Sequence, residues 1–129
     1  MALLAPALAW AEATPAALAG TRWQWVGLAG AGEALTIAEP ARYTLEFLPE
    51  GRLALRADCH RGAGGLAFPA PGILRVGAIA LTRALCPPGS LSDRFVQEVS
   101  AAARWSLRDG QLWLERAEGA ATLRFAPAP

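Results

Sequence analysis

RYTLEFLPEGRLALRA, residues 42–57, alternates apolar and polar side chains on both sides of a short turn. Before the turn, Tyr43, Leu45 and Phe47 share one face, and the same alternation resumes after it. The turn, Pro49-Glu50-Gly51, suits a tight reversal because proline presets φ and glycine accepts positive φ. The stretch therefore predicts an antiparallel β-hairpin with one buried face.

Further stretches repeat this period of two. RWQWV at residues 22–26 places two tryptophans on one face, and Asp109-Gly110 is a strong signal for a two-residue hairpin. We expect further strands at Leu66–Phe68 and Ile73–Leu81, with the glycines before them loosening the chain, and an irregular Gly/Ala loop over residues 28–41. Because the connections are short, these strands are predicted to pair antiparallel.

One segment breaks the period of two. Apolar residues recur at helical spacing over about residues 91–103: Leu91, Phe95, Val99 and Ala102. Ser90 is suited to cap such a helix, with Asp93 at its third position. Together the elements predict an α+β, mostly β fold: a strongly curved antiparallel sheet or partial barrel of about seven or eight short strands, covered by one helix.

The N-terminus has the pattern of an export signal. An apolar run from Ala2 to Ala9 is followed by small residues at signal-peptidase spacing, although the positive residues that normally precede such a run are missing. The run is too short to span a bilayer. We therefore expect a signal-peptide remnant over residues 1–13, a lead-in over residues 14–20 and a single domain over residues 21–126, in a periplasmic or secreted protein.

The charge balance limits the classes of partner. Twelve basic residues stand against eleven acidic ones, which gives a formal net charge of +1 at pH 7. No basic block is present, so the composition predicts no nucleic-acid binding. All the basic residues are arginines, and recognition of phosphate or carboxylate would use their guanidinium forks, although a GC-rich genome is the simpler source of this bias. We expect a monomer without a transmembrane segment.

The two cysteines and the single histidine are the most chemically suggestive group. Cys59 directly precedes His60, and Cys86 lies before the predicted helix. In an exported chain an even pair of cysteines favours a disulfide, which would stabilise the fold by about 3–4 kcal/mol. Two free thiols, or a metal or catalytic site of three ligands, are the alternatives. Since adjacent residues of an extended strand point to opposite faces, we expect His60 to face away from Cys59 and to bond a backbone group.

Few other residues suggest chemistry. Trp113 is predicted to lie on the face opposite its neighbours Leu112 and Leu114, and with His60 and Arg61 it is a candidate for a ligand or partner surface. The sequence predicts no catalytic residue, no metal ligand set and no cofactor.

The remaining polar and aromatic residues of interest are expected to have structural roles. Asp58 is expected to pair with Arg61 within a turn. The polar hairpin residues Glu46, Arg52 and Arg56 are expected to be solvated cross-strand partners. Three tryptophans are expected in the core: Trp23, Trp25 and Trp105.

The stretch Thr21–Phe125 resembles the META domain, also called HslJ-like, of bacterial envelope proteins. The matching pieces come in order: an early tryptophan strand, YTLEFLPEGRLALRADC, Gly64 after that cysteine, GAIALTRALCPPGSLSDRF with the second cysteine, and a W-S-L, L-W-L and L-R-F end. The chain departs from the family at three positions, where His60, Leu66 and Ala84 replace the usual Asn, Tyr and Met.

The resemblance implies a mostly β envelope domain without a known reaction, in a family associated with heat shock, antibiotic tolerance and secretion or motility. It favours a non-enzymatic exported domain that binds an envelope protein or small ligand in stress tolerance. One alternative is a periplasmic inhibitor of a hydrolase such as lysozyme, by architectural analogy. Another is a thiol or metal protein built on Cys59, His60 and Cys86.

Overall fold

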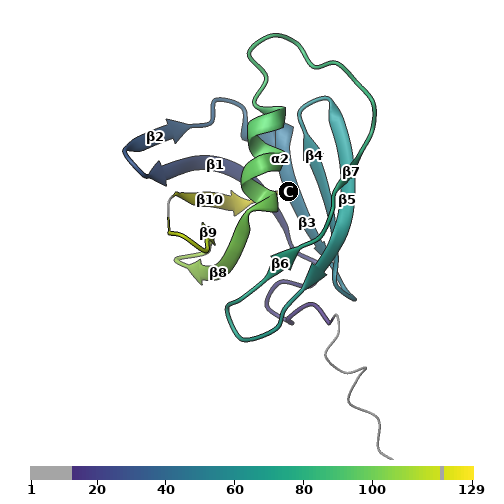
Figure 1. Cartoon of the computed structure of the whole chain (residues 1–129), viewed down its shortest axis with the longest axis vertical. Helices are drawn as coiled ribbons and strands as arrows, with labels where there is room; N and C mark the ends of the chain where they lie inside the picture. The colour runs from purple at the N-terminus through teal and green to yellow at the C-terminus, as the bar shows by residue number, and fades with distance from the viewer. Residues whose placement is uncertain (1–12, 120) are drawn as a thin grey trace, which may run out of the picture.

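A nearly closed antiparallel barrel dominates the fold. The structure is a computed structural model that describes residues 13–119 and 121–129, and within these residues ten strands join one sheet against which one α-helix packs (Figure 1). The main path of the sheet runs β6-β5-β4-β3-β1-β10-β9-β8, while β2 pairs with β1 and β7 with β5. A backbone bridge between Ile73 and Arg104 links its two ends. The predicted curved antiparallel sheet with one helix is confirmed.

The elements have the following bounds: β1 Arg22–Gly30, β2 Glu33–Thr36, the 3₁₀-helix η1 Pro40–Arg42, β3 Tyr43–Leu48, β4 Arg52–Ala57, β5 His60–Ala67, β6 Arg75–Val76, β7 Ala80–Leu81, α2 Ser92–Ser100, β8 Ala102–Arg108, β9 Gln111–Arg116 and β10 Thr122–Pro127.

Both hairpins predicted from turn chemistry are confirmed. In the β3–β4 hairpin Tyr43 lies opposite Ala57, and the connecting turn holds Glu50 and Gly51 at positive φ. In the β8–β9 hairpin the turn residues Asp109-Gly110 have φ values of 52° and 76°. These are the left-handed values that a two-residue turn requires to match the twist of the flanking strands.

The helix α2 closes the core with one aromatic side chain. Figure 1 shows α2 between the half of the sheet formed by β3–β5 and the half formed by β8–β10. Phe95 of α2 has no solvent exposure, and its ring centroid lies 5.2 Å from that of Trp25, 5.6 Å from that of Tyr43 and 6.2 Å from that of Phe125. Trp23 and Trp25 are buried, as predicted. Trp105 is half-buried and packs against the core.

The helix is shorter than the apolar spacing predicted. It ends at Ser100, and Ala102, which was expected on its buried face, is instead the buried first residue of β8. A residue inside the barrel is apolar whether it lies on a helix or a strand, so spacing alone missed the boundary. The predicted capping box also does not form: Leu91 is the N-cap, and the Ser90 hydroxyl accepts a hydrogen bond from the Ser92 amide at 3.1 Å.

The predicted Gly/Ala loop and the segment from Gly62 to Leu81 both have a different structure from the one expected. The predicted Gly/Ala loop contains β2, which forms a hairpin with β1. The glycines expected to loosen the chain lie within β5, where a Cβ at Gly62 would approach Leu81 Cδ2 to 2.7 Å and one at Gly64 would approach the Ala78 carbonyl to 2.9 Å. The single strand predicted over Ile73–Leu81 is therefore two short strands, β6 and β7, of which β7 packs tightly against these glycines.

A chain of charged side chains ties the helix to the sheet. Glu98 of α2 is buried, and its carboxylate accepts hydrogen bonds from Arg94 at 2.9 Å and from Arg116 of β9 at 3.1 Å. Arg94 also binds both carboxylate oxygens of Glu33 in β2, at 2.8 and 3.1 Å, and this contact lowers the pKa of Glu33. The network satisfies the buried Glu98 carboxylate and connects three separate elements.

The expected lead-in over residues 14–20 packs on the barrel. Leu18 is fully buried, and the Thr14 hydroxyl donates to the Leu48 carbonyl at 2.6 Å and accepts from the Gly51 amide at 2.9 Å. Residues 1–12, which make up nearly all of the expected signal-peptide remnant, lie outside the described residues. Within the described part of the chain, no helix has the length and apolar character needed to cross a membrane.

Candidate functional site

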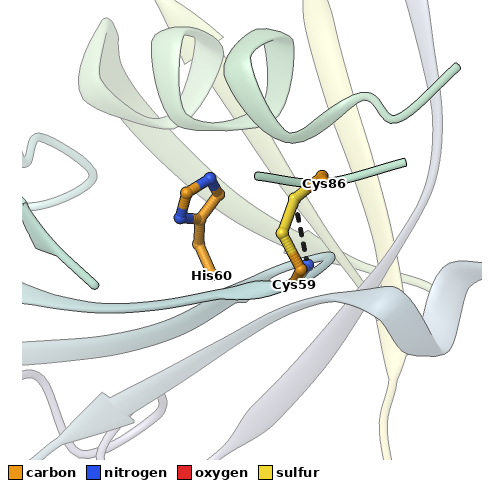
Figure 2. Close-up of side chains that lie close together, drawn as sticks. All are labelled: Cys59, His60 and Cys86. Carbon is orange, nitrogen blue, oxygen red and sulfur yellow. Dashed lines mark hydrogen bonds between the residues drawn. A yellow bond between two sulfur atoms is a disulfide. The ribbon is translucent and has the colours of Figure 1, made fainter. Parts of the chain in front are cut away.

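The two cysteines form a disulfide. Cys59 lies in the turn between β4 and β5, and Cys86 lies in the loop before α2, with 5.4 Å between their Cα atoms. The Cys59 amide also donates a hydrogen bond to Cys86 Sγ at 3.3 Å (Figure 2). Of the three interpretations left open by the sequence, the structure contains the cross-link.

His60 lies beside the disulfide rather than away from it. Figure 2 shows the imidazole next to the Cys59–Cys86 bond, and its ring and the two sulfurs place ligand atoms within 4.8 Å of one another. The predicted opposite orientation is wrong because Cys59 is a turn residue, preceded by Asp58 at a φ of 61°, and not part of an extended strand. The sulfurs are bonded to each other, so neither is a thiolate available to a metal.

Thr82 fixes the start of β5. The Thr82 carbonyl lies 2.9 Å from Nδ1 of His60, which confirms the predicted bond to a backbone group. The Thr82 hydroxyl accepts a hydrogen bond from the Arg61 amide at 3.0 Å, and the Thr82 amide donates to the Arg61 carbonyl at 2.9 Å. Both the amide and the carbonyl of Arg61 are therefore hydrogen-bonded to Thr82, in the loop that the disulfide anchors.

Asp58 is a buried carboxylate that the sequence assigned to the wrong partner. It was expected to pair with Arg61, but its Oδ1 accepts a hydrogen bond from Arg42 at 2.8 Å. Only 5% of Asp58 is exposed. The turn directs its side chain across the sheet to η1, a contact that proximity in sequence does not reveal. The Ser90 hydroxyl and the Arg42 guanidinium hold the pKa of Asp58 below its ordinary value of 3.8.

This depressed pKa makes a pH-dependent contribution to stability. The contribution is fully present above the ordinary pKa that Asp58 has in the unfolded chain, and it is lost as pH falls through the lower folded-state pKa. Urea unfolding at about pH 6 and about pH 3 measures the loss. We expect Asp58→Asn, which tolerates the same positive φ, to lose less stability between these pH values than the native chain. Equal losses would contradict a charged role for Asp58.

Trp113 lies on the outer face of β9, as its position between Leu112 and Leu114 predicted. The Arg108 guanidinium lies over its ring at 4.5 Å from the centroid, and that of Arg124 lies at 6.0 Å. Trp113 and Arg124 also line a pocket of about 220 Å³ together with residues of the β1–β2 hairpin. The indole N–H is buried and has no hydrogen-bond partner among the described residues.

The structure does not unite the three predicted surface residues. His60 and Arg61 begin β5, whereas Trp113 lies on β9, and β4, β3, β1 and β10 separate them in the sheet. The sequence pattern did not indicate the two arginines beside Trp113. Arg108 could have been found, because a two-residue turn at Asp109-Gly110 brings it close to Trp113 across the hairpin. The contact of Arg124 depends on the long-range pairing of β10 with β9.

Comparison with known proteins supports the fold and the family. The solution structure of a protein from Burkholderia xenovorans is 23% identical and superimposes with a TM-score of 0.71, covering 99% of this chain and 94% of its own. The crystal structure of a DUF4847 family protein from Bacteroides vulgatus is 12% identical, with a TM-score of 0.61 over 84% of this chain and 93% of its own. No curated protein matches. The META domain pattern matches residues 16–129, so the chain belongs to the META domain family.

Proposed function

We propose that this META domain is an exported, non-enzymatic binding domain that holds a partner or small ligand in the cell envelope and supports stress tolerance there. The Cys59–Cys86 disulfide carries the proposal. Disulfides persist in oxidising compartments and are rare in the cytosol, where thiol reductants keep cysteines in the reduced, unpaired form. The disulfide also anchors the loop before α2 to the β4–β5 turn, so it would stabilise the fold in an oxidising compartment.

The use of the Cys/His group supports a non-enzymatic role. Both sulfurs are occupied by the disulfide, and Nδ1 of His60 is engaged by the Thr82 carbonyl. A nucleophilic mechanism would need a free thiolate with an imidazole able to take its proton. In the folded, oxidised chain these three side chains fix a loop instead.

The surface around Trp113 supports binding. It combines an aromatic ring with two arginines, the residue types that dominate binding energy at protein interfaces. Neither Arg108 nor Arg124 forms a salt bridge among the described residues, so both guanidiniums can still bind acceptors. The hydrolase-inhibitor alternative gains no support from the comparisons.

The native protein recovered from cell fractions tests the export proposal. We expect it in the periplasmic fraction or the medium, cleaved near Ala11 or Ala13, and unchanged in mass by iodoacetamide unless it is first reduced. Intact-mass spectrometry measures the cleavage and the state of the cysteines together. Recovery from the cytosol with two alkylated cysteines would reject export, and stoichiometric zinc retained by the protein would reject the disulfide role.

A further inference from the structure

Three arginines surround a depression on the outer face of β1, β3, β4 and β5. We name it the arginine basin: Arg22, Arg56 and Arg61 with Thr44, Glu46 and Ala54. Its volume is about 350 Å³. This is within the range of pockets that hold small molecules, about 300–1,000 Å³. It lies outside the Trp113 pocket, and its residues come from four adjacent strands.

Strand register explains why the basin is hollow. Across β3 and β4, Thr44 lies opposite Arg56, and Glu46 lies opposite Ala54. Side chains on one face of a sheet stand side by side, so the short side chains of Thr44 and Ala54 leave space between the long ones. The longer arginine side chains therefore form the walls and the small residues the floor.

The charges of the basin are unbalanced. Arg56 and Arg61 lie directly opposite each other in β4 and β5, an arrangement of like charges that is unfavourable in a sheet. Neither they nor Arg22 forms a salt bridge with a side-chain carboxylate among the described residues, although Glu46 lies opposite Arg22 in the sheet. Arg22 instead donates a hydrogen bond from Nη1 to the Pro129 backbone oxygen at 2.7 Å. Five other carboxylates of the described chain are engaged by Arg42, Arg94, Arg104 and Arg116.

Arg56 is held through its side chain and Arg61 through its backbone. Nε of Arg56 donates a hydrogen bond to the Asp58 carbonyl at 3.0 Å. This bond does not use the two terminal nitrogens of the Arg56 guanidinium. The backbone of Arg61 is fixed by the two hydrogen bonds to Thr82. Fixing the Arg56 side chain and the Arg61 backbone lowers part of the entropic cost of binding a ligand between them.

From these observations we propose that the arginine basin binds a phosphate-bearing ligand. Guanidinium forks match phosphate oxygens in pairs, and a dianion between Arg56 and Arg61 would offset their repulsion. The proposal deepens the proposed binding function, on which it rests, by naming a ligand class. It is independent of export, because binding is measured on the purified chain whereas export is read from cell fractions.

Isothermal titration of the purified, oxidised full chain tests the proposal with inorganic phosphate, pyrophosphate and acetate. We expect saturable binding of pyrophosphate, weaker binding of acetate by about tenfold or more, and a rise in thermal stability with pyrophosphate. Arg61→Gln is expected to weaken pyrophosphate binding by about tenfold or more. Glycerol 3-phosphate separates the sources: tighter binding than inorganic phosphate indicates a phosphate ester, and equal binding indicates the free ion.

Arg75→Gln is the matched control, because it removes one exposed arginine from β6, outside the basin, with the same loss of charge. We expect it to change the affinity less than about twofold. Circular dichroism checks that both variants are folded. No saturable binding of pyrophosphate, equal binding of acetate, or equal losses in the two variants would each overturn the proposal.

Discussion

Replacing Phe95 with alanine is expected to lower the free energy of unfolding by about 3–5 kcal/mol, the range for a fully buried phenylalanine. Phe95 is completely buried and contacts aromatic rings from three strands. Its removal takes away apolar burial and leaves a cavity where α2 meets the sheet. Those rings are fixed on β1, β3 and β10, so they cannot collapse into the space without distorting the barrel. Urea unfolding followed by tryptophan fluorescence measures the change.

Gln97→Ala provides the control on the same helix. Gln97 is exposed, and its replacement is expected to change stability by less than about 0.5 kcal/mol. A cost for Phe95→Ala no larger than that of the control would mean that α2 contributes little to the core. Loss of near-ultraviolet circular dichroism with retained far-ultraviolet signal would locate the damage in the aromatic packing.

Removing the disulfide is expected to have the second largest effect. The free energy of unfolding of the double variant Cys59→Ala/Cys86→Ala should be about 3–4 kcal/mol lower than that of the native chain. The reason is that the unfolded chain gains conformational entropy when the cross-linked loop is opened. The two cysteines are 27 residues apart in sequence, which sets that loop length. Chemical denaturation of the native chain with and without a phosphine reductant should reproduce the difference between native and double variant.

Leu85→Ala is the control for the double variant. Leu85 lies next to Cys86 and is 97% exposed, so shortening its side chain should leave stability within about 0.5 kcal/mol. If reduction changes the native chain but not the double variant, the effect belongs to the cross-link. Equal stability of native and double variant would instead show that non-covalent contacts, such as that of Leu91 with Tyr43, are sufficient to hold the loop.

The parts of the fold predicted correctly are those set by neighbouring residues. Alternation and turn chemistry between Tyr43 and Ala57 define one hairpin completely, and Asp109-Gly110 defines another. The end of α2 was missed because Ala102 is apolar owing to its burial in the core, which suits the first residue of β8 as well as a residue of a helix. The glycines of β5 were interpreted as flexible because the residues that crowd them, 78–81, follow many positions later.

The candidate site divides in the same way. An even pair of cysteines in a chain with an export pattern favoured their cross-link, and the position of Trp113 between two leucines was enough to place it on the outer face. The partner of Asp58 was not predictable, since Arg42 reaches it only after β3 and β4 have paired. The arginine basin was hidden for a related reason: Arg22 and Arg61 meet Arg56 only in the register of four strands.

The way in which the barrel closes has a mechanical consequence. Its two ends meet through short backbone contacts, with the Leu74 amide bonded to the Ala103 carbonyl and the Trp105 amide bonded to the Gly72 carbonyl, each at 3.0 Å. The β1–β10, β3–β4 and β4–β5 pairs are joined by longer ladders. We therefore expect the backbone amides of this seam to exchange hydrogen for deuterium sooner than those of the longer ladders, while the aromatic cluster beneath α2 stays packed.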